Sequence, residues 1–246
     1  MKILLIITLH LISGGAAGID VIGFLGGRVS ITCTHNNYGW ERNFFCKMKT
    51  EAECGTISVT ESEQCNTWIH KDRFDLHDNC QTALIVTIRQ LSSEDAGTYQ
   101  CGDGRRWNHK FNLQMIRDSC CLGSKTVAGY LGETVTISCS YPEQFENHTK
   151  YLYKLDGHYI PIMIDTTETQ RGRFSISEDR SSKVVSVRIS DVSEDDGGVY
   201  FCAVSVGGQS VSYYSYYTET QLQVTGEIHY FITTVYIITA LGSNLC

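Results

Sequence analysis

The stretch that decides the fold is Asp95-Ala96-Gly97-Thr98-Tyr99-Gln100-Cys101, which recurs with changes as Asp196-Gly197-Gly198-Val199-Tyr200-Phe201-Cys202. Both copies follow the pattern Asp-x-Gly-x-Tyr-x-Cys, and an Arg-Phe pair precedes each one, beginning at Arg73 and at Arg173. A length of 246 residues suits one or two domains. Two copies of one pattern with the same companion residues therefore indicate two tandem domains of one kind.

This pattern resembles the segment that leads into strand F of an immunoglobulin domain. The resemblance implies that the Gly allows a tight turn and that the Tyr hydroxyl caps a nearby backbone group, the tyrosine corner. It implies that the Asp pairs with the upstream Arg and that the Cys crosses the sandwich to strand B. The implied inter-sheet disulfides are Cys33–Cys101 and Cys139–Cys202.

The rest of the chain follows the same repeat. Val29, Ile31 and Cys33 alternate with polar residues, as in a strand with one buried face. Residues 21–33 align without gaps to residues 127–139. The separation of the paired cysteines leaves room for the nine strands of a variable-type domain. We therefore expect an all-β chain with two tandem immunoglobulin variable-type β-sandwiches, at residues 19–117 and 118–226.

The two ends of the chain predict targeting to the cell surface. Residues 1–18 have a charged start, an apolar run and small residues, as a signal peptide does; the alternative is a buried N-terminal strand. Residues 228–246 contain no Lys, Arg, Asp or Glu, and as a helix they would span roughly 28 Å. We expect residues 227–246 to be a transmembrane segment of a single-pass type I plasma-membrane protein. The alternatives are a truncated anchor, a lipid-anchor signal and a secreted chain.

The composition indicates the compartment in which the chain resides and argues against one class of partner. Eleven Cys and two Pro are typical of an oxidising compartment. The net charge of −7 argues against nucleic acid as a partner. The first domain is nearly neutral, whereas residues 118–226 hold 8 basic against 14 acidic side chains. The junction at residues 117–121 lacks Pro and any Gly-Ser linker, so we expect the two domains to be closely coupled.

The remaining cysteines suggest further bridges. Cys46 and Cys54 flank a short polar turn that a disulfide would staple, and Cys65 and Cys80 are expected to pair because free exposed thiols are rare in secreted domains. Cys120 and Cys121 are adjacent and are not expected to bridge each other easily, so their pairing is left open. An odd count leaves Cys246 as the natural unpaired residue. The chain has no Cys-x-x-Cys pair, which argues against a zinc site, and no cofactor is expected.

Four segments of the first domain resemble the polymeric-immunoglobulin-receptor family with its CMRF-type leukocyte receptors: Asn43-Phe44-Phe45-Cys46-Lys47, Cys54, Arg73-Phe74 and residues 95–101. The family carries a second bridge at the positions of Cys46 and Cys54. Two departures stand out: Phe45 and Leu152 replace the family's strand C Trp, and Tyr153 replaces the extra Cys, so the second domain lacks that staple. The resemblance implies a cell-surface receptor for polymeric immunoglobulin, a lipid or another extracellular ligand.

The predicted binding surface is the end of the first domain that three loops form, at about residues 34–42, 55–63 and 102–110. We call this surface the loop end. Its candidate residues are Trp40, Arg105, Arg106 and Trp107, a mixture typical of binding hot spots and suited to an acidic face or a phosphate head group. The alternative is that Trp107 packs onto the rim of the sandwich while the Arg pair is solvated. The glycosylation sequon at Asn147 lies in the second domain and favours the first domain as the binding one.

The second domain carries Tyr213, Tyr214, Tyr216 and Tyr217 among Ser and Gly. This composition resembles a paratope. The alternative, which we expect, is a hairpin with alternate Tyr on a sheet face.

The sequence argues against an enzyme, because it has no Gly-x-Ser-x-Gly turn and no Gly-rich phosphate loop, and its eight His are scattered. The rival functions are cell adhesion and a secreted decoy. No signalling motif follows the apolar tail, so signalling would need an adaptor or co-receptor.

Overall fold

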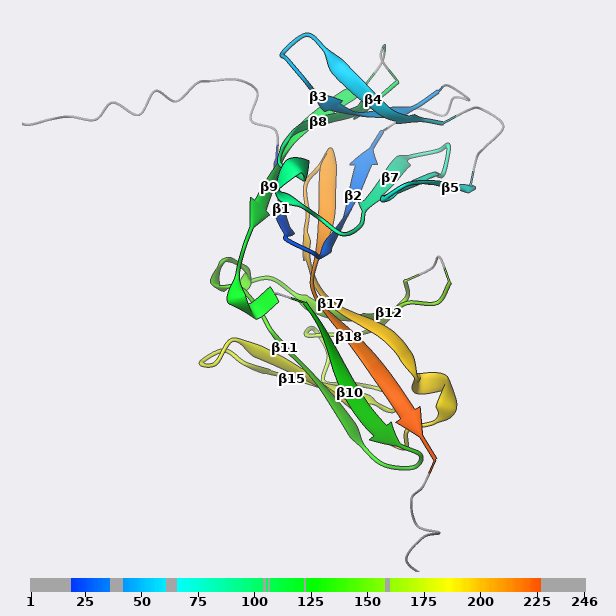
Figure 1. The fold of residues 1–246 in the computed structure, drawn as a ribbon, viewed down its shortest axis with the longest axis vertical. Coiled ribbons are helices and arrows are strands. Elements are labelled where there is room, and N and C mark those ends of the chain that lie inside the picture. The colour runs from blue at the N-terminus through cyan, green and yellow to red at the C-terminus, as the bar shows by residue number, and fades with distance from the viewer. Residues whose placement is uncertain are drawn as a thin grey trace, which may run out of the picture.

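The structure is a computed structural model that describes residues 19–35, 42–60, 66–103, 105, 107–121, 123–157 and 160–226. It contains two β-sandwiches that follow each other along the chain and lie one above the other in Figure 1. The predicted signal peptide and membrane segment fall outside the described residues, as do Cys65, Trp40 and Arg106. The prediction of an all-β chain with two tandem sandwiches is confirmed.

The strands of each sandwich alternate with short turns. The first sandwich contains β1 (Ile19–Phe24), β2 (Arg28–Thr34), β3 (Phe44–Met48), β4 (Cys54–Val59), β5 (Trp68–Lys71), β6 (Phe74–Asp78), β7 (Ala83–Ile88), β8 (Gly97–Gly102) and β9 (Asn108–Ile116). The second contains β10 (Ser124–Tyr130), β11 (Val135–Ser140), β12 (Lys150–Lys154), β13 (Ile162–Asp165), β14 (Gln170–Arg171), β15 (Phe174–Asp179), β16 (Val184–Ile189), β17 (Gly198–Val206) and β18 (Val211–Thr225).

Each sandwich buries the apolar side chains that the sequence pattern marked. In β2, Val29, Ile31 and Cys33 are fully buried, while the residues between them are half-buried. Phe45 and Leu152, which stand where the resembling family has Trp, are also buried. They lie directly opposite Cys101 and Cys202 in the sheets, so each packs at the centre of its core.

The sheets are not confined to single sandwiches. One five-stranded sheet (β1-β9-β8-β3-β4) belongs to the first sandwich, and one four-stranded sheet (β11-β16-β15-β14) belongs to the second. The third sheet runs through both, in the order β13-β12-β17-β18-β2-β7-β6-β5, with β10 also pairing with β18. The junction between sandwiches is therefore a hydrogen-bonded strand pair.

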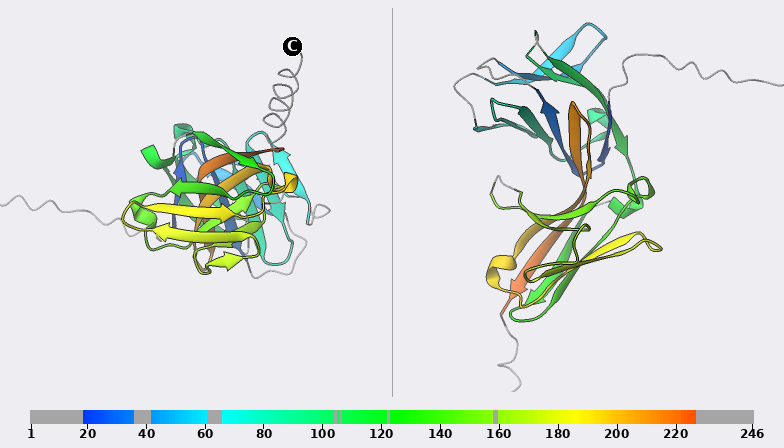
Figure 2. Two further views of the ribbon diagram at one scale, coloured as in Figure 1. Left: turned by 90° about the horizontal axis from the view of Figure 1, so that it is seen from below. Right: turned by 180° about the vertical axis from the view of Figure 1, so that it is seen from behind.

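Strand β18 makes this junction. It is 15 residues long, and its first part pairs antiparallel with β2, from Val211 opposite Cys33 to Tyr216 opposite Arg28. Strand β1 pairs in parallel with β9, which leaves an edge of β2 open, and the β17–β18 hairpin occupies that edge. Figures 1 and 2 show this orange hairpin extending from the second sandwich into the first, beside β2. An unpaired edge strand exposes main-chain hydrogen-bonding groups, so this pairing satisfies them within the chain.

The tyrosine-rich segment is consequently part of a hairpin. Tyr213, Tyr216 and Tyr217 are buried, and Tyr214 is half-buried. The structure supports the expected hairpin with tyrosines on its sheet faces. The close coupling expected between the domains is present, although the paired strands, rather than the short junction, produce it.

The two hydrophobic cores exchange residues. Val211 and Tyr213 of β18 pack within the core of the first sandwich. In the opposite direction, Phe24 at the end of β1 packs within the core of the second. Each sandwich is therefore completed by side chains from the other.

Candidate functional site

The Asp-x-Gly-x-Tyr-x-Cys corners form the rigid frame that carries the candidate sites. In the first sandwich, Arg73 donates two hydrogen bonds of 2.8 Å to the carboxylate of Asp95. The Tyr99 hydroxyl donates to the main-chain carbonyl of Asp95 at 2.8 Å. Both predicted interactions are confirmed.

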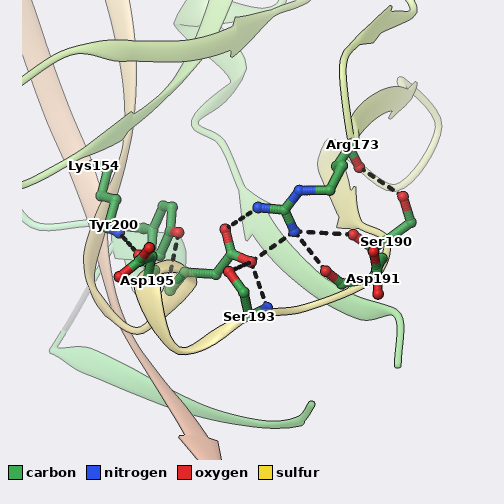
Figure 3. Close-up of polar contacts among 8 residues, drawn as sticks. Lys154, Arg173, Ser190, Asp191, Ser193, Asp195 and Tyr200 are labelled. Carbon is green, nitrogen blue, oxygen red and sulfur yellow. Dashed lines mark hydrogen bonds and ion pairs between the residues drawn. The ribbon is translucent and has the colours of Figure 1, made fainter. Parts of the chain in front are cut away.

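The second sandwich repeats this corner. Arg173 contacts the Asp196 carboxylate at 2.7 and 2.8 Å, and the Tyr200 hydroxyl donates to the Asp196 carbonyl at 2.7 Å. Figure 3 shows the Arg173 guanidinium also reaching the main-chain carbonyls of Ser190 and Asp191. Burial acts to raise the pKa of the Asp196 carboxyl, but hydrogen bonds from Arg173 and Ser193 outweigh it and hold the pKa below its ordinary value. The corner carboxylates are thus committed to the frame and are not available to a ligand.

A lysine completes each corner, and the sequence analysis missed it. The ammonium of Lys47 donates to the carbonyl of Glu94 and lies 5.5 Å from the centre of the Tyr99 ring. Lys154 donates to the carbonyl of Asp195 and lies 5.8 Å from the centre of the Tyr200 ring. The signal was present, because a Lys ends the corresponding segment in both repeats, after Cys46 in one and after Tyr153 in the other.

Disulfide bonds link the two sheets of each sandwich and connect β3 to β4. They join Cys33 to Cys101, Cys139 to Cys202, and Cys46 to Cys54. Cys80 is also disulfide-bonded, but its predicted partner Cys65 lies outside the described residues. No cluster of potential metal ligands is present in the described part of the chain.

One cysteine expectation is wrong: Cys120 and Cys121 are bonded to each other. They lie in a short 3₁₀ turn, η3 (Ser119–Cys121), where the carboxylate and carbonyl of Asp118 accept hydrogen bonds from the two cysteine amides. In extended backbone, successive side chains point to opposite faces. A tight turn removes that separation.

The loop end of the first domain brings together two of the four predicted binding residues. Arg105 is exposed, and Trp107 is half-buried with its ring stacked on His35 at 4.8 Å. Trp107 also packs against the first core, as the rim alternative predicted. The Asp103 carboxylate accepts hydrogen bonds from the amides of both Arg105 and Trp107, at 2.8 and 3.2 Å, so the loop between β8 and β9 has a defined shape.

The tip of the second domain's hairpin contributes to this same end. The Thr34 hydroxyl donates to the carbonyl of Gln209 at 2.7 Å, and the Thr34 amide donates to the carbonyl of Ser210 at 2.9 Å. The Thr34 carbonyl in turn lies 2.8 Å from Nε2 of His109, next to Trp107. The loop end is therefore built by both domains.

The predicted glycosylation residue lies elsewhere. Asn147 is exposed in the connection between β11 and β12 of the second domain, just after a short turn, η4 (Glu143–Phe145). A glycan at this position would point into solvent from the second domain.

A second candidate site, absent from the sequence analysis, is a cleft of about 880 Å³ between the sandwiches. One wall comes from β2, β5, β6 and β7 of the first sandwich, and the other from β12, β18 and the connection before β13. We call this the concave cleft, and its lining residues are Arg28, Ser30, Thr32, Trp68, His70, Asp75, Ile85, Thr87, Arg89, Tyr153, Leu155, Gly157, Ile160, Pro161, Ile162, Tyr214 and Tyr216. It depends on the β2–β18 pairing, which no local sequence signal indicates.

Comparison with known proteins places these features in context. The family model for the immunoglobulin V-set domain matches residues 20–116 and 123–225. The polymeric immunoglobulin receptor of Mus musculus is 30% identical over 198 residues, covering 76% of this chain and 25% of the receptor. CMRF35-like molecule 9 of Mus musculus is 29% identical over 97 residues, covering 37% of this chain and 29% of that protein.

Among solved structures, the ectodomain of a teleost fish polymeric immunoglobulin receptor is similar, with 21% identity and a TM-score of 0.35. The match covers 86% of this chain and 98% of that chain. The chain spans about a quarter of the length of the curated polymeric immunoglobulin receptors that it matches.

Proposed function

Because the chain belongs to the immunoglobulin V-set family, we propose that it is a cell-surface receptor whose first domain binds an extracellular ligand through its loop end. The family is non-enzymatic, and this chain is related to polymeric immunoglobulin receptors and CMRF35-like molecules. The ligand class that these relatives favour is polymeric immunoglobulin, with a lipid or another cell-surface ligand as the alternative.

The choice of this surface rests on one observation. The loop between β8 and β9 contains an exposed Arg and a Trp whose ring packs against the first domain. Arg105 is exposed, while the Trp107 ring rests on His35 and the first core. A preorganised loop loses less conformational entropy when it binds. Arg and Trp are the side chains most enriched in binding hot spots, and a guanidinium suits an acidic partner.

The packing of Trp107 refines its role. Since its ring is half-buried and stacked, Trp107 offers only part of its surface to a ligand, and Asp103 holds the backbone of both Trp107 and Arg105. Trp40 and Arg106, which the proposal also includes, lie outside the described residues. The sequon residue Asn147 is exposed on the second domain, so its glycan leaves this loop free.

The proposed location is the plasma membrane, with both domains outside the cell and an adaptor or co-receptor for signalling. No helix in the described residues is long and apolar enough to cross a membrane. The proposed anchor, residues 227–246, lies beyond them. Fractionation of animal cells that express the chain tests this: membrane-bound chain supports the anchor, and chain found mainly in the medium contradicts it.

The binding proposal is tested with the full chain on the surface of animal cells. Purified polymeric immunoglobulin, monomeric immunoglobulin and anionic lipid vesicles are offered in turn. Saturable binding that Arg105→Ala with Arg106→Ala weakens supports the proposal, and Arg180→Ala, at an exposed Arg of the second domain, is the matched control. Cell–cell aggregation without any ligand would favour adhesion instead.

A further inference from the structure

We propose that the concave cleft is a separate binding site for a protein segment that carries one carboxylate next to an apolar side chain. This site shares no residue with the loop end of the first domain. The proposal stands on four properties of the cleft: its walls, its one cation without a direct ion pair, a buried hydroxyl and an apolar rim.

The walls of the cleft are sheet faces that would be exposed to solvent if the two domains were separate. On one side, Ser30 and Thr32 of β2 lie beside Thr87 of β7. On the other, Tyr153, Tyr214 and Tyr216 form an aromatic surface, with neighbouring rings 5.5–5.8 Å apart. Because β18 hydrogen-bonds to β2, both faces belong to one sheet, and the cleft is built before any ligand arrives.

Arg28 supplies the cation. Its guanidinium lies 4.2 Å from the centre of the Phe201 ring, and it forms no ion pair with any described carboxylate. Glu219, which lines a smaller cavity of about 320 Å³ beside it, attracts Arg28 electrostatically without bonding to it. A half-buried guanidinium with unused donors favours a carboxylate that can accept two parallel hydrogen bonds.

The other charged residues of the cleft compensate one another. Nε of Arg89 lies 2.9 Å from the Asp75 carboxylate, whose other oxygen lies 2.7 Å from Nδ1 of His70. Arg28 and Arg89 against Asp75 leave a net charge of one positive unit among the described lining residues. This balance favours a single carboxylate over a phosphate dianion or a polyanion, which Asp75 would repel.

A buried hydroxyl gives a second, independent indication. Tyr153 lines the cleft and is only 4% exposed, and its hydroxyl interacts with Tyr214 of the same wall without forming a full hydrogen bond. Leaving a buried polar atom unpaired costs roughly 1–3 kcal/mol. A bound polar group would remove that cost.

The rim of the cleft indicates that the bound segment also carries an apolar side chain. Trp68 is 37% and Ile162 is 40% exposed, and the two lie on opposite walls of the cleft. An apolar side chain next to the carboxylate would be covered from both sides. Together with the single positive charge, this rim favours a peptide segment over a sugar or a lipid head group.

The experiment uses the full chain displayed on animal cells and a library of random dodecapeptides displayed on phage. Phage that bind cells displaying the parent chain are kept, and those that also bind cells displaying Arg28→Gln are then removed. We expect the surviving sequences to share an Asp or Glu beside an aromatic or aliphatic residue. A synthetic peptide of that kind should bind at least about tenfold more weakly when its acid is changed to the amide.

Variants separate this site from the loop end. Arg28→Gln and Trp68→Ala should each weaken the peptide by about tenfold, while Arg28→Lys should retain part of the affinity. Arg180→Gln and Tyr130→Ala, at an exposed Arg and an exposed aromatic outside the cleft, are matched controls. Arg105→Ala should leave peptide binding unchanged, even if it abolishes the function proposed above.

Three results would overturn the proposal. The first is a selection that yields no sequence dependent on Arg28. The second is a set of enriched peptides without acidic residues. The third is Arg28-dependent binding of phosphatidylserine vesicles, of heparin or of a second copy of the chain, in place of the peptides.

Discussion

The ring of Phe24 lies 6.0 Å from the ring of Phe145, edge to face, although Phe24 ends the first strand of the first sandwich and Phe145 belongs to the core of the second. Phe24 also meets Tyr217 of β18 at 6.5 Å. With Val211 and Tyr213 inserted in the first core, the exchange of side chains is reciprocal. We infer that each domain is stabilised by side chains of the other.

Replacing Phe24 tests this exchange. Phe24→Ala should lower the free energy of unfolding by about 3–5 kcal/mol, because a fully buried ring is removed. Tyr130 stands at the same position of the second repeat but is 36% exposed, so Tyr130→Ala should change stability by less than about 0.5 kcal/mol. Thermal unfolding measures both. Two separate transitions, with only the first domain affected by Phe24→Ala, would contradict the exchange.

The reciprocal contact predicts an effect across domains. Tyr213 is 2% exposed and packs in the first core, opposite Ile31 of β2. Tyr213→Ala should increase amide hydrogen exchange in β2 and β7 of the first sandwich, whereas β11 and β16 of the second should keep their protection. Mass spectrometry of the exchanged peptides checks this. Equal loss of protection in all four strands would mean that the change acts globally.

The corner carboxylates predict a dependence on pH. Burial acts to raise the pKa of the Asp95 carboxyl, but hydrogen bonds from Arg73 and Ser92 lower it below its ordinary value of 3.8. Since the folded pKa is the lower one, this group stabilises the fold above about pH 4, and its contribution is lost as the pH falls through the folded value.

Asp95→Asn should therefore cost about 2 kcal/mol at pH 7. That difference from the parent chain should shrink as the pH falls below 4. Urea unfolding at pH 7, 5 and 3 measures it, and a difference that stays constant over this range would refute the role of the charge.

The contribution of the disulfide between β3 and β4 to stability can be measured. Removing Cys46–Cys54 by the paired change Cys46→Ala with Cys54→Ala should destabilise the fold by about 2.5 kcal/mol, from the entropy of a short closed loop. Denaturant unfolding checks the value. Unchanged stability would mean that the bridge only orders the hairpin in the native state.

The local frame could be predicted from the sequence, because its signals are local. The spacing of Arg73, Asp95, Tyr99 and Cys101 defines a corner whose bonds all lie within one sandwich. The alternation in β2 likewise predicted which of its side chains are buried. Both follow from the geometry of a single strand or turn.

The relation between the domains could not be predicted in the same way. Phe24 and Tyr130 occupy equivalent positions in the repeat, yet one is buried and the other exposed, because only the first is covered by a neighbouring domain. The tyrosines of β18 gave two interpretations until their pairing with β2 was known. The concave cleft follows from that pairing and has no sequence signature of its own. The bond between Cys120 and Cys121 depends on a short turn that the sequence analysis did not predict.

The central claim is that the loop end of the first domain binds the extracellular ligand, and one measurement tests it most directly. Titrations of the ligand candidates named above are compared on cells that display the parent chain, Arg105→Ala with Arg106→Ala, or Trp107→Ala, after antibody staining confirms equal display. The account predicts an affinity loss of at least about thirtyfold for Trp107→Ala, or about 2 kcal/mol, and an Arg contribution that weakens as salt rises. Unchanged affinity in both variants would contradict it.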